Sequence, residues 1–251
     1  MEIPQRELQY FKKSLQQIKE YPMYTKDYFY IPAYGKEDNI SRIHTIEGWI
    51  NKINAMNRKI IFSFDEAIRW VLQMDFSVSD LVQIKKDFEQ EMCDYYIENA
   101  VFRLITLWDL LAQLSNIYYE TSLEPSNIGY KKYFIGKKGN NKKKIKLDKN
   151  LQEDFNKFST QIKDYILEKD NIQVEGVWEG NHTYISDILR NPLTHRHDPH
   201  SFSIIEGEMH LSEIPIISIK RGLEDFVKVN EFITIIIDKL ETKINVEELT
   251  I

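Results

Sequence analysis

Apolar residues recur every three or four positions over several long stretches of the chain, a spacing typical of amphipathic helices. The longest of these stretches covers residues 77–120. Because no proline lies within residues 33–124 and no glycine within residues 49–128, this stretch is predicted to be one long helix, with a kink or break near residues 91–94 as an open alternative. Its second half is apolar on most sides, which predicts a central position in a helical bundle.

One polar stripe interrupts that apolar surface. It contains Asn99, Arg103, Thr106, Asp109, Gln113 and Asn116. Buried polar groups need partners, so the stripe is expected to face solvent, a partner subunit or an internal polar site.

Shorter helices are predicted elsewhere along the chain. They cover residues 4–21, 38–57, 64–74 (beginning near Ser63 or Asp65), 147–169, 183–190 and 222–240. Pro192 is expected to end the helix at 183–190, because proline disfavours helical geometry at the residue before it. Residues 201–211 surround a Glu206-Gly207 pair and predict a small hairpin.

The predicted fold class is all-α: a helical bundle with a long central helix, an added N-terminal helical part and one small β-hairpin. Residues 1–75 are interpreted as an N-terminal helical extension packed on the core, and residues 76–251 as the bundle domain. No apolar run reaches membrane-spanning length and no secretory signal is apparent, so we expect a cytoplasmic protein without membrane contact. The single cysteine, Cys93, fits a reducing compartment.

Charge is unevenly distributed along the chain. The formal net charge is −6, yet residues 131–149 hold nine lysines and one acid, which leaves 24 basic and 38 acidic side chains elsewhere. This lysine-rich loop is either a solvated, flexible segment or an arm that gathers a polyanion. On the second interpretation the candidate RNA contacts are Lys137, Lys138, Lys142, Lys143 and Lys144.

The candidate chemistry lies in the segment Arg190-Asn191-Pro192-Leu193-Thr194-His195. A guanidinium keeps its charge near neutral pH and binds a phosphodiester through two hydrogen bonds, whereas an imidazole takes up and releases a proton there. Together Arg190 and His195, with Asn191 as a further donor, suit metal-free cleavage of RNA through its 2′-hydroxyl. The alternative is structural, with Arg190 and His195 satisfying carbonyls at a helix end.

This segment resembles the signature of the HEPN superfamily, Arg-x₄₋₆-His with a polar residue after the arginine, which Arg190, Asn191 and His195 match. Residues 98–116 resemble the helix that packs opposite the signature, and the likeness covers residues 78–245 in pattern. It is closest to a bacterial subgroup of stand-alone members.

The resemblance implies an all-α fold and a metal-independent endoribonuclease of toxin–antitoxin or phage-defence systems, with no cofactor. It also implies a homodimer with a composite site, so that RNA and a cognate antitoxin are the candidate partners. Asp109 or Glu98 would orient the arginine, and His197 would support the site. The alternative is a catalytically inactive, HEPN-like nucleotide-binding or dimerisation module.

The third hypothesis is a metal-dependent hydrolase. His195, His197, His200 and Asp198 supply common metal ligands. They lie in one short loop, however, whereas structural zinc sites normally use separated pairs of ligands, so no metal is expected.

Overall fold

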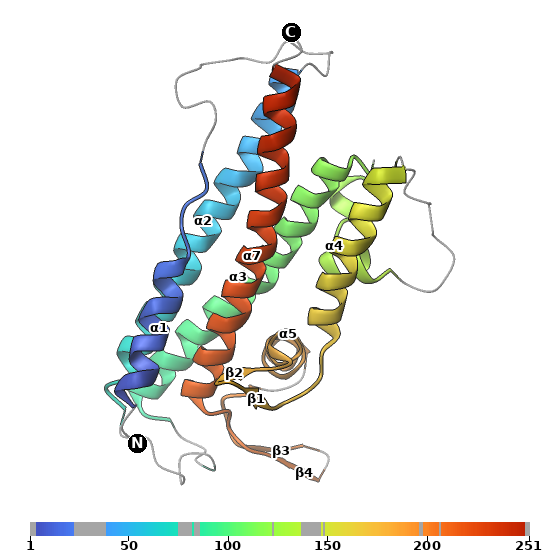
Figure 1. Ribbon diagram of the computed structural model, residues 1–251. Coiled ribbons are helices and arrows are strands. Elements are labelled where there is room, and N and C mark those ends of the chain that lie inside the picture. The colour runs from blue at the N-terminus through green and yellow to red at the C-terminus, as the bar shows by residue number, and fades with distance from the viewer. Residues whose placement is uncertain are drawn as a thin grey trace. The chain divides into compact units, whose positions relative to one another are not determined.

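The computed structural model describes residues 4–22, 39–74, 82, 86–121, 123–136, 147, 149–195, 198–205 and 207–248. The side chains of residues 39–44, 195, 205 and 244–248 lie outside this description. In chain order the elements (Figure 1) are α1 (Gln5–Gln17), α2 (Asn39–Val71), α3 (Phe88–Tyr119), the 3₁₀ turn η2 (Pro125–Asn127), the π-helix η3 (Lys131–Ile135), α4 (Lys149–Leu167), β1 (Gln173–Val174), β2 (Val177–Trp178), α5 (Asn181–Thr183), the π-helix η4 (Tyr184–Arg190), α6 (Asn191–His195), β3 (Ser203–Ile205), β4 (Glu208–His210) and α7 (Pro215–Glu248). The predicted all-α fold class is confirmed. Within the described part of the chain, no helix has the length and apolarity needed to cross a membrane.

The helices differ from the predictions at several places, two of which lie in the first half of the chain. The two helices predicted at 38–57 and 64–74 are replaced by one helix, α2, which covers Asn39–Val71. The Ser63 hydroxyl donates a hydrogen bond to the Lys59 carbonyl within that helix (2.9 Å) and caps no new one. The helix predicted at 77–120 is not continuous, since Lys86 and Asp87 are not helical and α3 begins at Phe88. Asp87, a residue type favoured before a helix, accepts the N–H of Glu91 on its carbonyl (3.0 Å).

Two small antiparallel hairpins interrupt the helices. The predicted one is confirmed as β3 paired with β4, in which Ile204 lies opposite Met209. A second hairpin, β1 with β2, was not predicted. Its turn residues Glu175 and Gly176 both have positive φ (52° and 86°), which is the turn geometry that matches the twist of two-residue hairpins.

The chain divides into two compact units. Unit 1 contains residues 1–18, 58–106 and 164–228, and unit 2 contains residues 19–57, 107–163 and 229–251. The predicted division at residue 75 stays a prediction.

The core of unit 1 forms where α2, α3, η4 and α7 meet. Phe64 and Phe226 are fully buried, with ring centroids 6.4 Å apart. A Cβ at Gly222 would lie 2.7 Å from the Phe64 ring, so the glycine allows α7 to approach α2 closely. Ile185 and Leu189 of η4 are fully buried, which ties the motif helix to the core.

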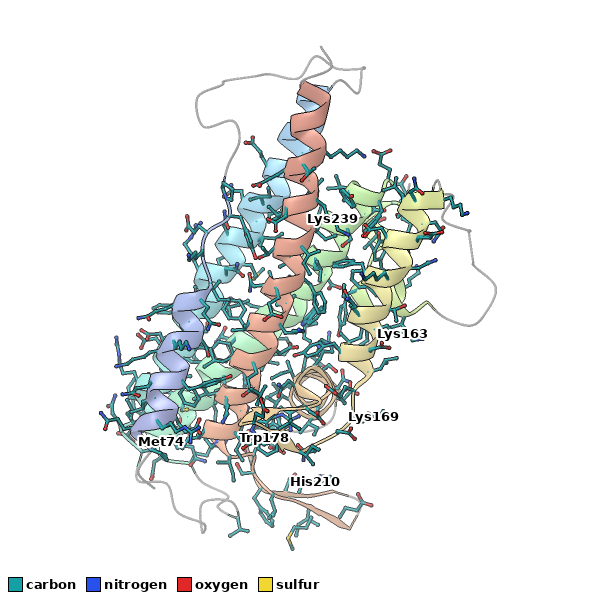
Figure 2. The ribbon with its side chains drawn as sticks, viewed as in Figure 1. Met74, Lys163, Lys169, Trp178, His210 and Lys239 are labelled. Atoms are coloured by element: carbon teal, nitrogen blue, oxygen red, sulfur yellow. The ribbon has the colours of Figure 1, made fainter. Side chains whose placement is uncertain are left out.

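The core of unit 2 is rich in aromatic side chains from α3, α4, η3 and α7. Trp108 is fully buried, with its ring centroid 6.0 Å from that of Phe232. Beside this core, Lys239 of α7 (labelled in Figure 2) donates to Asp154 (2.7 Å), which also accepts the Tyr119 hydroxyl (2.8 Å).

Candidate functional site

The candidate motif lies on a continuous run of helical residues formed by α5, η4 and α6. Pro192 does not end it, and the prediction that the helix stops at residue 190 is wrong: Asn191 has helical dihedrals (φ −65°, ψ −43°) and helix continues to His195. The physical reason is the π-helical geometry of η4. In η4 hydrogen bonds join residues five apart, and the Asn191 N–H donates to the Ser186 carbonyl. Pro192 follows where this bonding changes to that of α6, at the second residue of α6.

A buried polar network holds the start of this helix. Gly180 precedes it with φ 65°, and a Cβ there would lie 2.3 Å from the Asp170 carbonyl oxygen, so only glycine fits. The buried Asn181 side chain donates to Glu224 Oε2 (2.9 Å) and accepts from Arg221 Nε (3.1 Å). The helix therefore begins at a rigidly defined point.

Arg221 is the centre of that network. Its guanidinium also donates to the side chain of Asn171 and to the carbonyl of Glu179 (2.8 Å). It stacks over the rings of Trp178 and Tyr184, at 5.0 and 4.3 Å from their centroids. Arg221 is only 2% exposed, so these contacts compensate for the burial of its charge.

The other end of the motif helix presents the predicted site residues. Arg190 Nη1 donates to Asn191 Oδ1 (3.3 Å), and Asn191 Nδ2 donates to Asp187 Oδ1 (3.3 Å). Ser186 Oγ donates to the same Asp187 oxygen (2.8 Å). Asp187 fixes which way the Asn191 amide faces, and Asn191 in turn holds the half-buried guanidinium of Arg190. Neither contact of Asp187 was predicted.

Position 195 lies on the same face of α6 as Asn191, because the two are four residues apart in an α-helix. The imidazole of His195 lies outside the described side chains, and so do residues 196 and 197. The candidate RNA contacts Lys137, Lys138, Lys142, Lys143 and Lys144 also lie outside the described residues. Their predicted roles stay predictions.

The two predicted supporting acids lie in different units. Asp109, in unit 2, accepts the backbone N–H of Tyr130 (3.0 Å) and thereby holds the chain as it enters η3. Gln113 and Asn116 of the same polar stripe donate to the carbonyls of Pro125 (2.8 Å) and Leu123 (3.2 Å). In unit 2 the stripe therefore binds the segment that follows α3.

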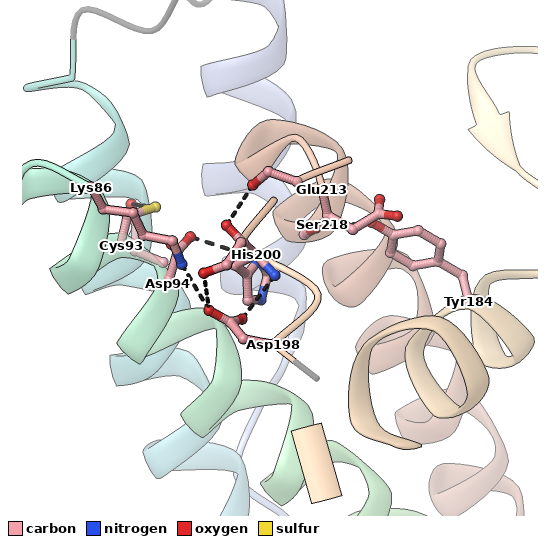
Figure 3. Close-up of polar contacts among 11 residues, drawn as sticks. Lys86, Cys93, Asp94, Tyr184, Asp198, His200, Glu213 and Ser218 are labelled. Carbon is pink, nitrogen blue, oxygen red and sulfur yellow. Dashed lines mark hydrogen bonds and ion pairs between the residues drawn. The ribbon is translucent and has the colours of Figure 1, made fainter. Parts of the chain in front are cut away.

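Glu98, in unit 1, feels the charges of Asp198 and Lys86. Those two residues form a charged cluster with Asp94 and His200 (Figure 3). Lys86 Nζ lies 2.8 Å from Asp94 Oδ2 and 3.0 Å from Asp198 Oδ2. His200 Nδ1 lies 3.7 Å from Asp94 Oδ1, and this imidazole is only 1% exposed. Neither Lys86 nor Asp94 was singled out from the sequence, because each lies in or near an ordinary helix start.

Burial dominates the electrostatics of this cluster. It raises the pKa of Asp94 to about 7, opposed by the adjacent Lys86 ammonium, and it lowers the pKa of His200 to about 4. The pKa of Glu98 is raised by burial and by the charge of Asp198. The pKa of Asp198 is lowered, against its own burial, by the Ser201 hydroxyl and by Lys86.

The cluster contains side chains of the types that bind metals, Asp94, Asp198 and His200, together with the positively charged Lys86. Among the described residues, no three His, Cys, Asp or Glu side chains have the arrangement of a metal site. In the cluster the Lys86 ammonium lies between the carboxylates of Asp94 and Asp198. His195 and His197, the other members of the metal hypothesis, fall outside the described side chains, so that hypothesis stays untested.

No protein-family model, curated protein or solved structure matches this chain. The HEPN resemblance therefore depends on the amino-acid sequence alone and stays a prediction.

Proposed function

We propose that this protein is a metal-independent endoribonuclease that cleaves RNA with Arg190, Asn191 and His195. The observation that supports this proposal is the contact between the Arg190 guanidinium and the Asn191 side chain, on the face of α6 that also carries position 195. The half-buried Arg190 guanidinium, oriented by its hydrogen bond to Asn191, can bind a phosphodiester through two parallel hydrogen bonds.

The proposed reaction is an internal transesterification. His195 removes the proton from a ribose 2′-hydroxyl, and the 2′-oxygen forms a bond to the adjacent phosphorus. The bond from phosphorus to the 5′-oxygen breaks, and that oxygen receives a proton from a second general acid. Arg190 stabilises the added negative charge on the phosphoryl oxygens. The products are a 2′,3′-cyclic phosphate and a 5′-hydroxyl, and DNA is not a substrate because it has no 2′-hydroxyl.

A second copy of the chain would supply the second acid. Each chain carries one Arg190 and one His195. A twofold axis brings identical surfaces of two copies together, so a C₂ dimer would place two imidazoles at one site. One could then act as base while the other acts as acid.

RNA cleavage in excess EDTA tests the proposal. We expect the wild type to cleave a mixed RNA substrate and His195→Ala to be slower by a factor of about 10²–10⁴, the usual contribution of general acid–base catalysis. An RNA with a 2′-deoxy group at the cleaved position should remain intact. Equal activity of wild type and His195→Ala, or none in the wild type across broad RNA substrates, would remove the catalytic proposal.

Salt dependence tests the lysine-rich loop. A variant with Gln at Lys137, Lys138, Lys142, Lys143 and Lys144 should bind RNA more weakly, and its affinity should depend less steeply on salt. Each lost phosphate contact should reduce the slope of log K against log salt by about 0.7, because fewer counterions are released from single-stranded RNA. An unchanged slope would show that these lysines do not contact the phosphates.

A further inference from the structure

The outward face of α3 in unit 1 carries large aromatic side chains at positions where a surface helix normally carries polar ones. Phe88, Tyr95 and Phe102 are 62%, 54% and 39% exposed, and all three belong to unit 1. Residues seven apart return to nearly the same side of an α-helix, about 10.5 Å further along its axis. These three side chains therefore form a line along α3, the aromatic row.

Neighbouring aromatic side chains extend this apolar surface onto α2. The Phe62 side chain of α2 is 58% exposed, and its ring centroid lies 6.1 Å from that of Tyr96. The Tyr96 ring in turn lies 5.1 Å from the Tyr95 ring, and the Phe88 ring meets the Trp70 ring of α2 edge-on at 5.6 Å. These contacts hold the exposed rings in place, so the surface is already formed in a single copy of the chain.

The surface is large enough to be the apolar centre of a protein interface. An aromatic side chain has roughly 200 Å² of surface, so the four exposed side chains (Phe62, Phe88, Tyr95 and Phe102) present about 400 Å² per copy. Each partner in a stable interface buries roughly 800 Å², of which about 60% is apolar. The aromatic side chains alone supply most of that apolar area, and contiguous apolar patches of this size are often interaction sites.

The spacing of the aromatic row suits packing against a second copy of the same helix. Apolar residues repeated every seven positions lie along the line where two helices of a coiled coil pack. Tyr95 is the centre of the row, with one ring seven residues away on each side. If two copies of α3 pack antiparallel about a twofold axis at Tyr95, Tyr95 meets its own copy and Phe88 meets Phe102 of the second copy. Every ring of the row then has a partner.

Charge along α3 favours the antiparallel direction. Asp87, Glu89 and Glu91 lie at the N-terminal end of the row, Arg103 lies at its C-terminal end, and all four side chains are at least partly exposed. An antiparallel pair brings the acidic end of one copy to Arg103 of the other, whereas a parallel pair would bring two acidic ends together. The charges at the two ends of the row therefore complement those of a second copy of this chain.

We propose that the aromatic row is an interface between two copies of this chain, which pack antiparallel through α3 about a twofold axis at Tyr95. The inference goes beyond the proposed function, which calls for a second copy but assigns no surface to it. It does not rest on RNA cleavage, because none of Arg190, Asn191 and His195 belongs to the row.

The association of the full chain, measured by sedimentation equilibrium without RNA, tests the proposal. We expect the wild type to form a dimer and Phe102→Glu to raise the Kd of that dimer by a factor of about 10² or more, because each carboxylate would lie against the acidic end of the second copy. Ile235→Glu is the matched control, since Ile235 is 38% exposed on α7 in unit 2. Its Kd should stay within about threefold of the wild-type value.

Cysteine cross-linking tests the register of the two helices. Tyr95→Cys should form a disulfide-linked dimer under mild oxidation, because a residue on a twofold axis meets its own copy. Phe88→Cys and Phe102→Cys should cross-link when the two variants are mixed, and much less when each is alone. The native Cys93 is buried, so the wild type should give little cross-linking and measures the background.

A monomer at every concentration would overturn the proposal and would leave the row to another segment of this chain or to a different protein. A dimer that Phe102→Glu and Ile235→Glu weaken equally would also overturn it, because the interface would lie elsewhere. If Phe102→Glu does not fold, the cross-links decide: folded Tyr95→Cys without disulfide-linked dimer above the background overturns the proposal. A dimer with the expected cross-links in a protein that cleaves no RNA would support this proposal and remove the proposed function alone.

Discussion

Unit 1 contains one buried polar cluster that is held by hydrogen bonds and another in which buried polar atoms have no hydrogen-bond partner among the described residues. The guanidinium of Arg221 donates to Asn181, to Asn171 and to the carbonyl of Glu179. In the other cluster, both ring nitrogens of His200 and both carboxylate oxygens of Asp94 are buried without a hydrogen-bond partner among the described residues, and Lys86 provides an ion pair instead. Buried polar atoms without hydrogen bonds destabilise a fold by about 1–3 kcal/mol each.

This difference separates structural polar groups from candidates for function. In the Arg221 network all three guanidinium nitrogens donate hydrogen bonds, which stabilises one conformation and specifies the helix start beside it. An unsaturated cluster lowers stability, so its retention needs another explanation, and here it lies against the turn that follows the proposed catalytic histidine.

The largest expected effect follows from removal of Arg221. Arg221→Met should lower the free energy of unfolding by about 3–5 kcal/mol. It leaves the buried Asn181 oxygen and the carbonyl of Glu179 without their donor, and it removes the positive charge that acts on the buried Glu224. Urea unfolding measures this change. Arg69→Met is the control: Arg69 is 64% exposed beside Glu66, and its loss should change stability by less than about 0.5 kcal/mol. Similar small losses in both variants would show that the network does not stabilise the fold.

The saturated and unsaturated clusters also differ in how far the sequence could predict them. The apolar faces were predictable: Phe155, Phe158 and Ile162 repeat at helical spacing and are buried on α4. So was the hairpin around Gly207, because a Glu-Gly pair between apolar residues favours that turn. The hairpin β1–β2 has strands of only two residues, too short to show any alternation.

The contacts of the site were not predictable from local pattern. Lys86 and Asp198 lie 112 positions apart, and only the packing of α3 against the 198–201 turn brings them together. Helix through Pro192 was missed because the proline rule assumes α-helical turns, whereas η4 is π-helical. Glu98 was one of two acids predicted to orient Arg190, and that role stays a prediction; the charges of Asp198 and Lys86 act on Glu98, and the sequence pattern did not show this.

Two buried histidines offer a smaller and more direct contrast. His182 is fully buried, with Nδ1 3.3 Å from the Asp225 carboxylate, whereas the buried ring of His200 has no hydrogen-bond partner in the part of the chain that the structure describes. His182→Leu should lower the free energy of unfolding by about 2 kcal/mol, because it removes a partner of a buried carboxylate. His200→Leu should be neutral or raise it by about 1 kcal/mol at pH 7, because a desolvated polar ring is replaced by an apolar side chain. Chemical denaturation of both variants checks this, and equal destabilisation by the two would contradict the contrast.

The smallest predicted effect is a pair of opposite pH dependences within the unsaturated cluster. The raised pKa of Asp94, about 7, means that the folded state holds this proton more tightly, so the contribution of Asp94 to stability falls as pH rises from about 4 to 7. The lowered pKa of His200, about 4, means that the unfolded state binds the proton more tightly, so its contribution rises between about pH 4 and 6.5. In the wild type the two slopes largely cancel.

Single variants should expose each slope. Relative to the wild type, Asp94→Asn should make stability rise more steeply with pH between 4.5 and 6.5, and His200→Leu should make it rise less steeply or fall, each by up to about 1 kcal/mol per pH unit. Lys86, Glu98 and Asp198 remain in both variants, so their titration is a shared background. The measurement is the free energy of unfolding at several pH values in this range. If both variants changed the slope in the same direction, Asp94 and His200 would be exchanging protons as one coupled pair, and the separate assignment of their pKa shifts would fail.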